Sequence, residues 1–405
     1  MTGDGHVWLR IAHQPLFSES FWLASRPFTL PLAYKLVGGS DEALLWLHGC
    51  FAVLSWVALA FAAAAFMETK LLAAIAFALV LGLGLSTPAV CWDVIVRSES
   101  IGLSAFLLCL AAVTFLAQNN ELPERMGVAW AILAVIAALL TAFARETNAY
   151  LLPLLGVCSF WAVWAGAEAR RLLRSGALAL ALVAVFLSCQ ANTRASGRYA
   201  FPLMNVIFER VLPNSRKLAY FRDALSMPVS RALLERRSHA ASAEHRTAFH
   251  APELAEFRAW VRERGYSAYQ SYLLTHARTT FGEANHYFPT YARADFTRRG
   301  RAASVLDEVI VGGPTAAYPR LVLAITGVLG LLASFSRARH VRVLGVLSVF
   351  CVLATITQTF ICYHGDAMET LRHGMMVGTM LRLSAVFAVL LGLAVAARSR
   401  GVRRA

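Results

Sequence analysis

The stretch Met126–Trp164 reads MGVAWAILAVIAALLTAFARETNAYLLPLLGVCSFWAVW, and its composition decides the fold class. Two long apolar blocks, Met126–Ala144 and Asn148–Trp164, are separated only by the short polar turn Arg145-Glu146-Thr147. Each block is about long enough to cross a ~30 Å hydrocarbon layer at ~1.5 Å per residue. The stretch therefore predicts two transmembrane helices joined by a turn at the membrane surface.

The whole chain shares this apolar character. Of its 405 residues, 58% are hydrophobic and 15% are charged, and the mean hydropathy is +0.56. A soluble domain has about 45–50% apolar and about 25% charged residues, which excludes a soluble enzyme, a disordered protein and a coiled coil. The apolar blocks run to about 17–23 residues, unlike the ~10-residue alternating strands of an outer-membrane barrel. We therefore predict an all-α polytopic membrane protein.

Nine apolar blocks are expected to span the membrane: Leu44–Met67, Leu71–Val90, Ser100–Ala117, Met126–Ala144, Asn148–Trp164, Ser175–Gln190, Pro319–Phe335, Val341–Ile361 and Met375–Ala397. The long stretch between the sixth and seventh blocks is polar and has helical patterns, so we expect it to lie outside the bilayer. The predicted organisation is a surface loop (1–43), six spans (44–190), an extracytoplasmic helical segment (191–318), three spans (319–397) and a basic tail (398–405).

Basic residues in short loops predict the orientation, because cytoplasmic loops carry an excess of lysine and arginine. Glu168–Arg174, Ser336–Arg342 and Arg398–Ala405 are strongly basic and fall on one side if nine spans alternate. We therefore predict a multi-pass protein of the inner (plasma) membrane, with a cytoplasmic C-terminus and the long segment outside. The N-terminus is then also outside, so we expect either an apolar span encoded upstream of Met1 or translocation of a short N-terminal tail.

The formal net charge of +14 is almost wholly due to arginine, with lysine only at Lys35, Lys70 and Lys217. This charge is not accompanied by an aromatic platform or by a zinc-ligand spacing, which a nucleic-acid-binding module would show. The bilayer is therefore an expected partner of this chain, and nucleic acid is not.

Ionisable residues at the outer face are the candidates for chemistry, because charges in or near the bilayer are costly and tend to be functional. Asp4 can act as a general base or can belong to a frayed terminus. Glu99 opens the third span, where it either supports the helix start or forms a paired-acid site with Asp4. Arg145 either snorkels to lipid head groups or holds a lipid phosphate through its planar fork.

The segment before the last span holds further candidates. Asp366 and Glu369 have the spacing of a capping box, and they share a helical face with His373. A divalent cation on that face is conceivable, although the sequence does not require one, and we assign no metal ligands. Arg372 flanks the same face.

Arg382 lies about one-third of the way into the last span. An unpaired arginine inside the bilayer costs several kcal/mol. We therefore expect Arg382 to have a partner, which is Glu99, Asp93 or an anionic ligand.

Three short motifs contain the candidate residues Asp4, Glu99 and Arg145. Asp4 stands in Gly3-Asp4-x-x-x-Trp8-Leu9, Glu99 stands in Ser98–Leu103 (SESIGL), and Arg145 stands in a turn shortly before Leu151-Leu152-Pro153. With the loop Arg26–Leu32, this arrangement resembles the GT-C class of membrane glycosyltransferases, and it is similar to the protein O-mannosyltransferases and the lipid A aminoarabinose transferase. That class usually has a helix before the first acid, aspartate at the second acid and often lysine in the turn, and this sequence departs from it at all three points.

The resemblance implies an inverting glycosyltransferase that moves a sugar from a polyprenyl-phosphate donor to an envelope glycan, lipid or protein acceptor. It implies that Asp4 is the general base and that Glu99 orients the acceptor or assists. Arg145, Arg372 and Arg382 would neutralise the departing lipid phosphate. The expected substrate- and phosphate-binding residues are these three arginines together with His373 and Asp366. The alternatives are a lipid-linked glycan polymerase, ligase or transporter, which need no early acid, and a truncated, non-catalytic protein.

Overall fold

The computed structural model describes residues 5–118, 123–164, 168–238, 251–293, 313–368 and 370–402. Their regular secondary structure is entirely helical, with no strand in these ranges. Seven of the helices are long and apolar enough to cross a membrane. Many of their large apolar side chains are exposed, among them Trp46, Phe61, Ile132, Leu180 and Val389. Exposure of this kind along whole helices is expected where lipid tails replace water as the solvent.

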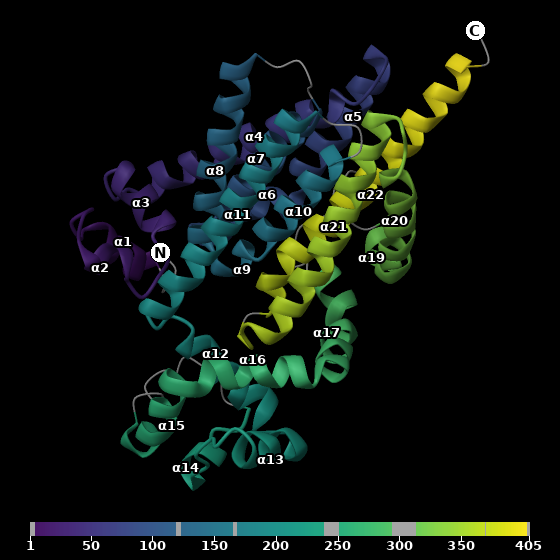
Figure 1. Cartoon of the computed structure of the whole chain (residues 1–405). Coiled ribbons are helices and arrows are strands. Elements are labelled where there is room, and N and C mark those ends of the chain that lie inside the picture. Colours follow the sequence, from purple (N-terminus) through teal and green to yellow (C-terminus); the bar gives the residue numbers. More distant parts are fainter. Residues whose placement is uncertain are drawn as a thin grey trace.

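The spanning bundle (Figure 1) consists of α4 (Asp41–Ala64), α5 (Lys70–Gly84), α6 (Thr87–Asp93), α7 (Ser98–Gln118), α8 (Glu124–Ala144), α9 (Glu146–Ala149), α10 (Leu151–Trp164), α11 (Ala169–Ala195), α20 (Pro319–Ser334), α21 (Arg339–His364) and α22 (Thr370–Val402). The most buried of the spans are α7 and α21, with 83% and 72% of their apolar windows covered by other helices. The corresponding values for α8 and α11 are 33% and 22%, so these two helices lie at the periphery.

Two of the nine predicted spans differ from single long helices. The second is divided into α5 and α6, which meet at an angle of 56°. Proline in the first turn of α6 is compatible with a helix start but cannot continue α5, because it has no backbone N–H to donate. The seventh is α20, which has only 16 residues. The described residues thus contain seven helices that are long and apolar enough to span, or eight if the bent pair counts as one, and the number nine stays a prediction.

Glycines allow α20 and α21 to approach each other closely. A Cβ atom on Gly345 would lie 2.6 Å from the backbone nitrogen of Ser334 and 2.7 Å from the carbonyl oxygen of Gly330. A Cβ atom on Gly330 would in turn lie 3.0 Å from the carbonyl oxygen of Gly345. Small residues of this kind promote helix association in membranes, where packing replaces the hydrophobic driving force.

Arginines join the loops at one end of the bundle. Glu124 pairs with Arg170 at 2.5 Å and with Arg174 at 2.9 Å, both from the first predicted basic loop. Arg339, from the second basic loop, donates a hydrogen bond to the carbonyl oxygen of Ala117. These two loops therefore lie at the same end, and α22 also ends there (Figure 1). This arrangement agrees with the alternation of spans on which the predicted orientation is based.

The opposite end is covered by short helices from the long polar segment (Figure 1): α12 (Ala200–Val206), η1 (Ile207–Val211), α13 (Ser215–Asp223), α14 (Arg231–Leu234), η4 (Pro252–Leu254), α15 (Ala255–Trp260), η5 (Val261–Gly265), α16 (Tyr266–Thr275), α17 (Ala277–Ala292) and α19 (Pro314–Ala317). Most of them share a core of their own, which includes Ile207, Phe221 and Val261. The N-terminal helices are α1 (Gly5–Ala12), α2 (Glu19–Trp22) and α3 (Thr29–Leu36). They pack through Trp8, Leu30 and Tyr34.

The glycine contact generates a stability prediction. We expect Gly345→Leu to lower the free energy of unfolding by about 1–3 kcal/mol, because overpacking against backbone atoms forces α20 and α21 apart. Gly392→Leu on α22 is the control, since a Cβ atom there meets nothing within 4 Å. The measurement is the thermal unfolding midpoint of the purified chain in detergent. An equal loss in the two variants would contradict the close α20–α21 contact.

Candidate functional site

A buried carboxylate lies at the end of the bundle that faces the short helices. Glu99 is in the first turn of α7, and its side chain is 0% exposed. Its Oε1 atom accepts a hydrogen bond from Nη1 of Arg145 at 2.7 Å and another from Nε of Arg372. Pairing of this kind is required, because an isolated buried charge would lose its hydration without compensation. One carboxylate thus holds two arginines from distant parts of the chain.

The turn between α8 and α10 positions Arg145. Its backbone is extended (φ −153°, ψ 113°), which interrupts the helix between Ala144 and α9. Nε2 of Gln358 on α21 donates to the carbonyl oxygen of Thr147 at 3.0 Å. Glu146 pairs with Arg198 at 2.5 Å. The turn is therefore tied to two neighbouring elements, and the Arg145 side chain, which is 13% exposed, is held in place.

The loop between α21 and α22 places a second carboxylate at this end. Oδ1 of Asp366 accepts hydrogen bonds from Nδ2 of Asn205 at 3.1 Å and from the backbone nitrogen of Met368 at 3.0 Å. Burial raises the pKa of the Asp366 carboxyl above its usual value, whereas these two hydrogen bonds and the charge of Arg145 oppose the increase. Burial is the largest of these effects, so Asp366 binds a proton more readily than an exposed aspartate.

A third arginine comes from the short helices. The guanidinium of Arg210, on η1, lies 3.9 Å from the ring centroid of Tyr363, in a cation–π contact. Its Nη2 atom donates to the carbonyl oxygen of Asp366 at 3.4 Å. Arg210 thus joins Arg145 and Arg372 at this end of the bundle, where His373 directly follows Arg372 on α22. We call these three arginines, together with Glu99, Asp366 and His373, the arginine cluster.

A chain of hydrogen bonds fixes the short helices next to the cluster. Nε2 of His364 lies 3.0 Å from the carbonyl oxygen of Thr280, which can only accept, so this nitrogen carries the proton. Nδ1 of His364 then accepts from the hydroxyl of Tyr269 at 2.9 Å. The contact joins α16 and α17 to the end of α21, directly before Asp366.

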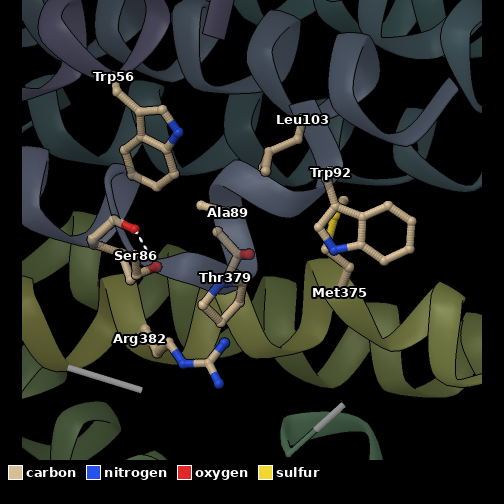
Figure 2. Close-up of a pocket in the computed structure, with 10 residues that line it drawn as sticks. Trp56, Ser86, Ala89, Trp92, Leu103, Met375, Thr379 and Arg382 are labelled. Atoms are coloured by element: carbon tan, nitrogen blue, oxygen red, sulfur yellow. Dashed lines mark hydrogen bonds between the residues drawn. The ribbon is translucent and has the colours of Figure 1, made fainter. Parts of the chain in front are cut away.

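Arg382 lies apart from this cluster, in a narrow crevice (Figure 2). The crevice is lined by residues of α4, α5–α6, α7 and α22, which include Trp56, Pro88, Trp92, Leu103, Met375 and Thr379. Arg382 is 6% exposed, and its Nη1 atom would lie 2.9 Å from a Cβ atom on Gly378. The side chain therefore folds back along α22 by about one turn, towards the end of the bundle where the arginine cluster lies.

The structure brings together most of the predicted site residues. Glu99, Arg145, Arg372, His373 and Asp366 gather in the arginine cluster, and Arg382 lies further along α22. The hydrogen bonds of Glu99 come from Arg145 and Arg372, and Asp93 accepts one from Ser100 at 2.5 Å.

Two of the predicted residues, Asp4 and Glu369, lie outside the described residues. α1 begins directly after Asp4, and its Trp8 shares an apolar cluster with Ile101 and Ala144, which are neighbours of Glu99 and Arg145. Among the described residues, no three His, Cys, Asp or Glu side chains are placed to hold a metal ion.

Sequence reasoning missed Arg210, Asn205 and Tyr363. The first two lie in the long polar segment, where arginine is frequent and no spacing sets Arg210 apart. Tyr363 lies at the end of a span, directly before His364. The contacts of all three depend on how the short helices dock onto the bundle, which local pattern does not encode.

Comparisons with known proteins do not assign the chain to a family. No protein-family model matches the sequence, and no curated protein and no solved structure matches it.

The Glu99 pair leads to a stability prediction. We expect Glu99→Gln to lower the free energy of unfolding by about 3–5 kcal/mol, because it leaves two poorly exposed arginines without their carboxylate. Glu99→Gln combined with Arg145→Gln should lose less than the sum of the two single variants. The control Glu124→Gln removes an exposed pair, which solvent screens, and should leave the free energy of unfolding nearly unchanged. Chemical unfolding in detergent measures these values, and strict additivity would show that Glu99 and Arg145 are independent.

Asp366 generates a prediction about pH. A carboxyl group whose pKa is raised by folding contributes stability below the unfolded-state pKa of ~3.9, and this contribution is lost as pH rises through the folded-state value. Asp366→Asn keeps an oxygen that can accept from Asn205 and Met368, but it has no charge to bury. We therefore expect the variant to have a higher unfolding midpoint than the unmodified chain at pH 7.5 and an equal one near pH 4. A lower midpoint of the variant at pH 7.5 would contradict the assignment.

Proposed function

We propose that the chain is a glycosyltransferase that moves a sugar from a polyprenyl-phosphate donor to an acceptor at the outer face of the inner (plasma) membrane. The acceptor hydroxyl attacks the anomeric carbon, the bond between this carbon and the phosphate oxygen breaks, and polyprenyl phosphate leaves. Asp4 takes the acceptor proton as general base. The class of acceptor is an envelope glycan, lipid or protein.

The observation that carries this proposal is a buried carboxylate that holds two arginines at the end of the bundle that faces the short helices. Glu99 accepts from one of the five N–H groups of the Arg145 guanidinium, whose planar fork can also bind phosphate oxygens. Three arginines against two carboxylates leave a positive excess where a lipid phosphate would arrive. Stabilisation of a leaving phosphate by fixed positive charges needs no rearrangement during the reaction.

The orientation supports the same proposal. The basic loops lie at one end of the bundle, and the short helices lie at the other (Figure 1), where they contact the arginine cluster through Asn205 and Arg210. If the basic end is cytoplasmic, as the positive-inside rule predicts, the cluster is on the outer side. We propose that the short helices shape the acceptor groove, since Asn205 and Arg210 extend from them into the cluster.

A lipid-linked-glycan transporter is the second candidate, and the broken α5–α6 pair favours it. Discontinuous spanning helices often form substrate sites within the bilayer in transporters. In this chain, residues at the break between α5 and α6 line a crevice, and the buried Arg382 lines the same crevice (Figure 2). Transfer of sugar to an acceptor, as opposed to movement of an intact lipid-linked sugar across a vesicle membrane, distinguishes the two functions.

Arg145 provides the test of the proposed glycosyltransferase. We expect Arg145→Ala to raise the donor concentration for half-maximal transfer by roughly tenfold to hundredfold, which corresponds to the ~1.5–3 kcal/mol of a hydrogen bond to a charged group. Arg145→Lys should recover part of the loss, since lysine keeps the charge but not the fork. The measurement is transfer from radiolabelled polyprenyl-phosphate sugars in membranes that contain matched amounts of protein.

Two controls complete this experiment. Arg231→Ala removes an arginine whose side chain is 93% exposed, and it should leave donor use unchanged. Asp4→Asn should lower the maximal rate, because it removes the proposed base and not a phosphate contact. Unchanged donor dependence in Arg145→Ala would remove this residue from the site. If no donor supports transfer and lipid-linked sugar moves across vesicle membranes, these two results would favour the transporter.

A further inference from the structure

An apolar groove lies on the surface of the bundle between α17, α20 and α21. It has a volume of about 450 Å³. Most of its lining is apolar: Phe288 from α17, Leu323, Ala324, Gly327, Val328 and Leu331 from α20, and Val352 and Ile356 from α21. This size is within the ~300–1,000 Å³ of typical small-molecule sites. The groove shares none of its lining residues with the arginine cluster or with the crevice at Arg382.

The groove lies along α21, which is long and apolar enough to cross a membrane, and along the shorter apolar helix α20, so lipid can reach it from the bilayer. The flanking surface of α20 is also apolar, with Leu321, Ile325 and Leu332 all strongly exposed. Within the hydrocarbon layer this surface faces lipid tails and not water. α20 has 16 residues, about 24 Å at ~1.5 Å per residue, which is shorter than a ~30 Å hydrocarbon layer. A chain of methylene groups that lies along α20 would fill the groove without any polar contact.

The outer end of the groove is basic and aromatic. Arg320, in the first turn of α20, lines the groove and is exposed. Its Nη2 atom donates to the carbonyl oxygen of Asn285 at 2.8 Å, which places the guanidinium between α17 and α20. Tyr318 is 65% exposed directly before α20, and exposed tyrosines are typical of the level of the lipid head groups. No carboxylate is among the ten residues that line the groove.

We propose that this groove binds one acyl chain of an anionic glycerophospholipid, with the lipid phosphate held by Arg320. The apolar lining matches the acyl chain, and the positive charge of Arg320 at the outer end matches the phosphate of a lipid whose head group carries no compensating cation. A helix of a second protein would leave Arg320 facing an apolar surface unless it also supplied an acid. The site is separate from the proposed transfer reaction, and the proposal does not depend on it.

The test uses a photoactivatable phosphatidylglycerol with a diazirine in its acyl chain, incorporated into nanodiscs with the full chain. Cross-linked peptides, identified by mass spectrometry, should include the segments around Val328 and Ile356. Ala324→Phe should reduce this labelling by about tenfold, because its ring occupies the groove. Ile325→Phe is the matched control, since Ile325 is 49% exposed on the same helix but does not line the groove. It should label like the unmodified chain.

The head group is tested separately, so that the proposal stays testable if Ala324→Phe does not fold. Labelling by the phosphatidylglycerol probe should exceed that by a phosphatidylcholine probe with the same acyl chain, and Arg320→Gln should abolish this difference. Competition by unlabelled phosphatidylglycerol but not by polyprenyl phosphate supports a phospholipid site. Three results would overturn the proposal: equal labelling by the two probes, competition by polyprenyl phosphate, or cross-links from these segments to a second polypeptide.

Discussion

The buried carboxylate of Glu99 is the constraint on which the arrangement of the bundle depends. Removing an ion from water into the protein interior costs several kcal/mol even after relaxation, so the charge must be matched when the helices assemble. Its partners come from the α8–α10 turn and from the start of α22, which are separated by more than 200 positions in the sequence. Helices α7, α8 and α22 therefore have to meet in one register. A slip of a single residue along α7 would turn Glu99 by about 100° away from both arginines.

The same requirement extends from the bundle to the short helices. Once Arg145 and Arg372 are committed to Glu99, the adjacent polar groups at this end must also find partners. Asp366 obtains them from Asn205 and Arg210, and His364 obtains them from Tyr269 and the backbone of Thr280. The long polar segment is therefore more than a covering loop, because it supplies hydrogen-bond partners to Asp366 and His364 at this end of the bundle. A site that combines residues of the spans with residues of this segment follows directly from that arrangement.

The sequence was sufficient for the parts of the structure that depend on local pattern. Apolar blocks such as Met126–Ala144 form spanning helices, and Arg145 lies in the turn that its polar neighbours indicated. The break between α5 and α6 had a visible signal at Pro88, but a continuous apolar composition masked it. Glu99 and Arg145 were recognised as separate candidates, whereas their contact was not, because the two residues are far apart in the chain. Arg210 carried no signal at all, since its role depends on how η1 docks next to Asp366.

Helix α21 connects the two sites that have been described. Ile356 lines the apolar groove, and Gln358, two positions later, holds the turn of Arg145. Two positions correspond to about 200° around a helix, so these side chains lie on opposite faces of α21. The helix is 72% buried and closely packed against α20 through glycine, which leaves little room for its two faces to move independently. Any displacement of α21 by a molecule in the groove would therefore shift Gln358, and with it the turn that carries Arg145, relative to Glu99. The groove and the contact that holds the Arg145 turn thus lie on opposite faces of one helix.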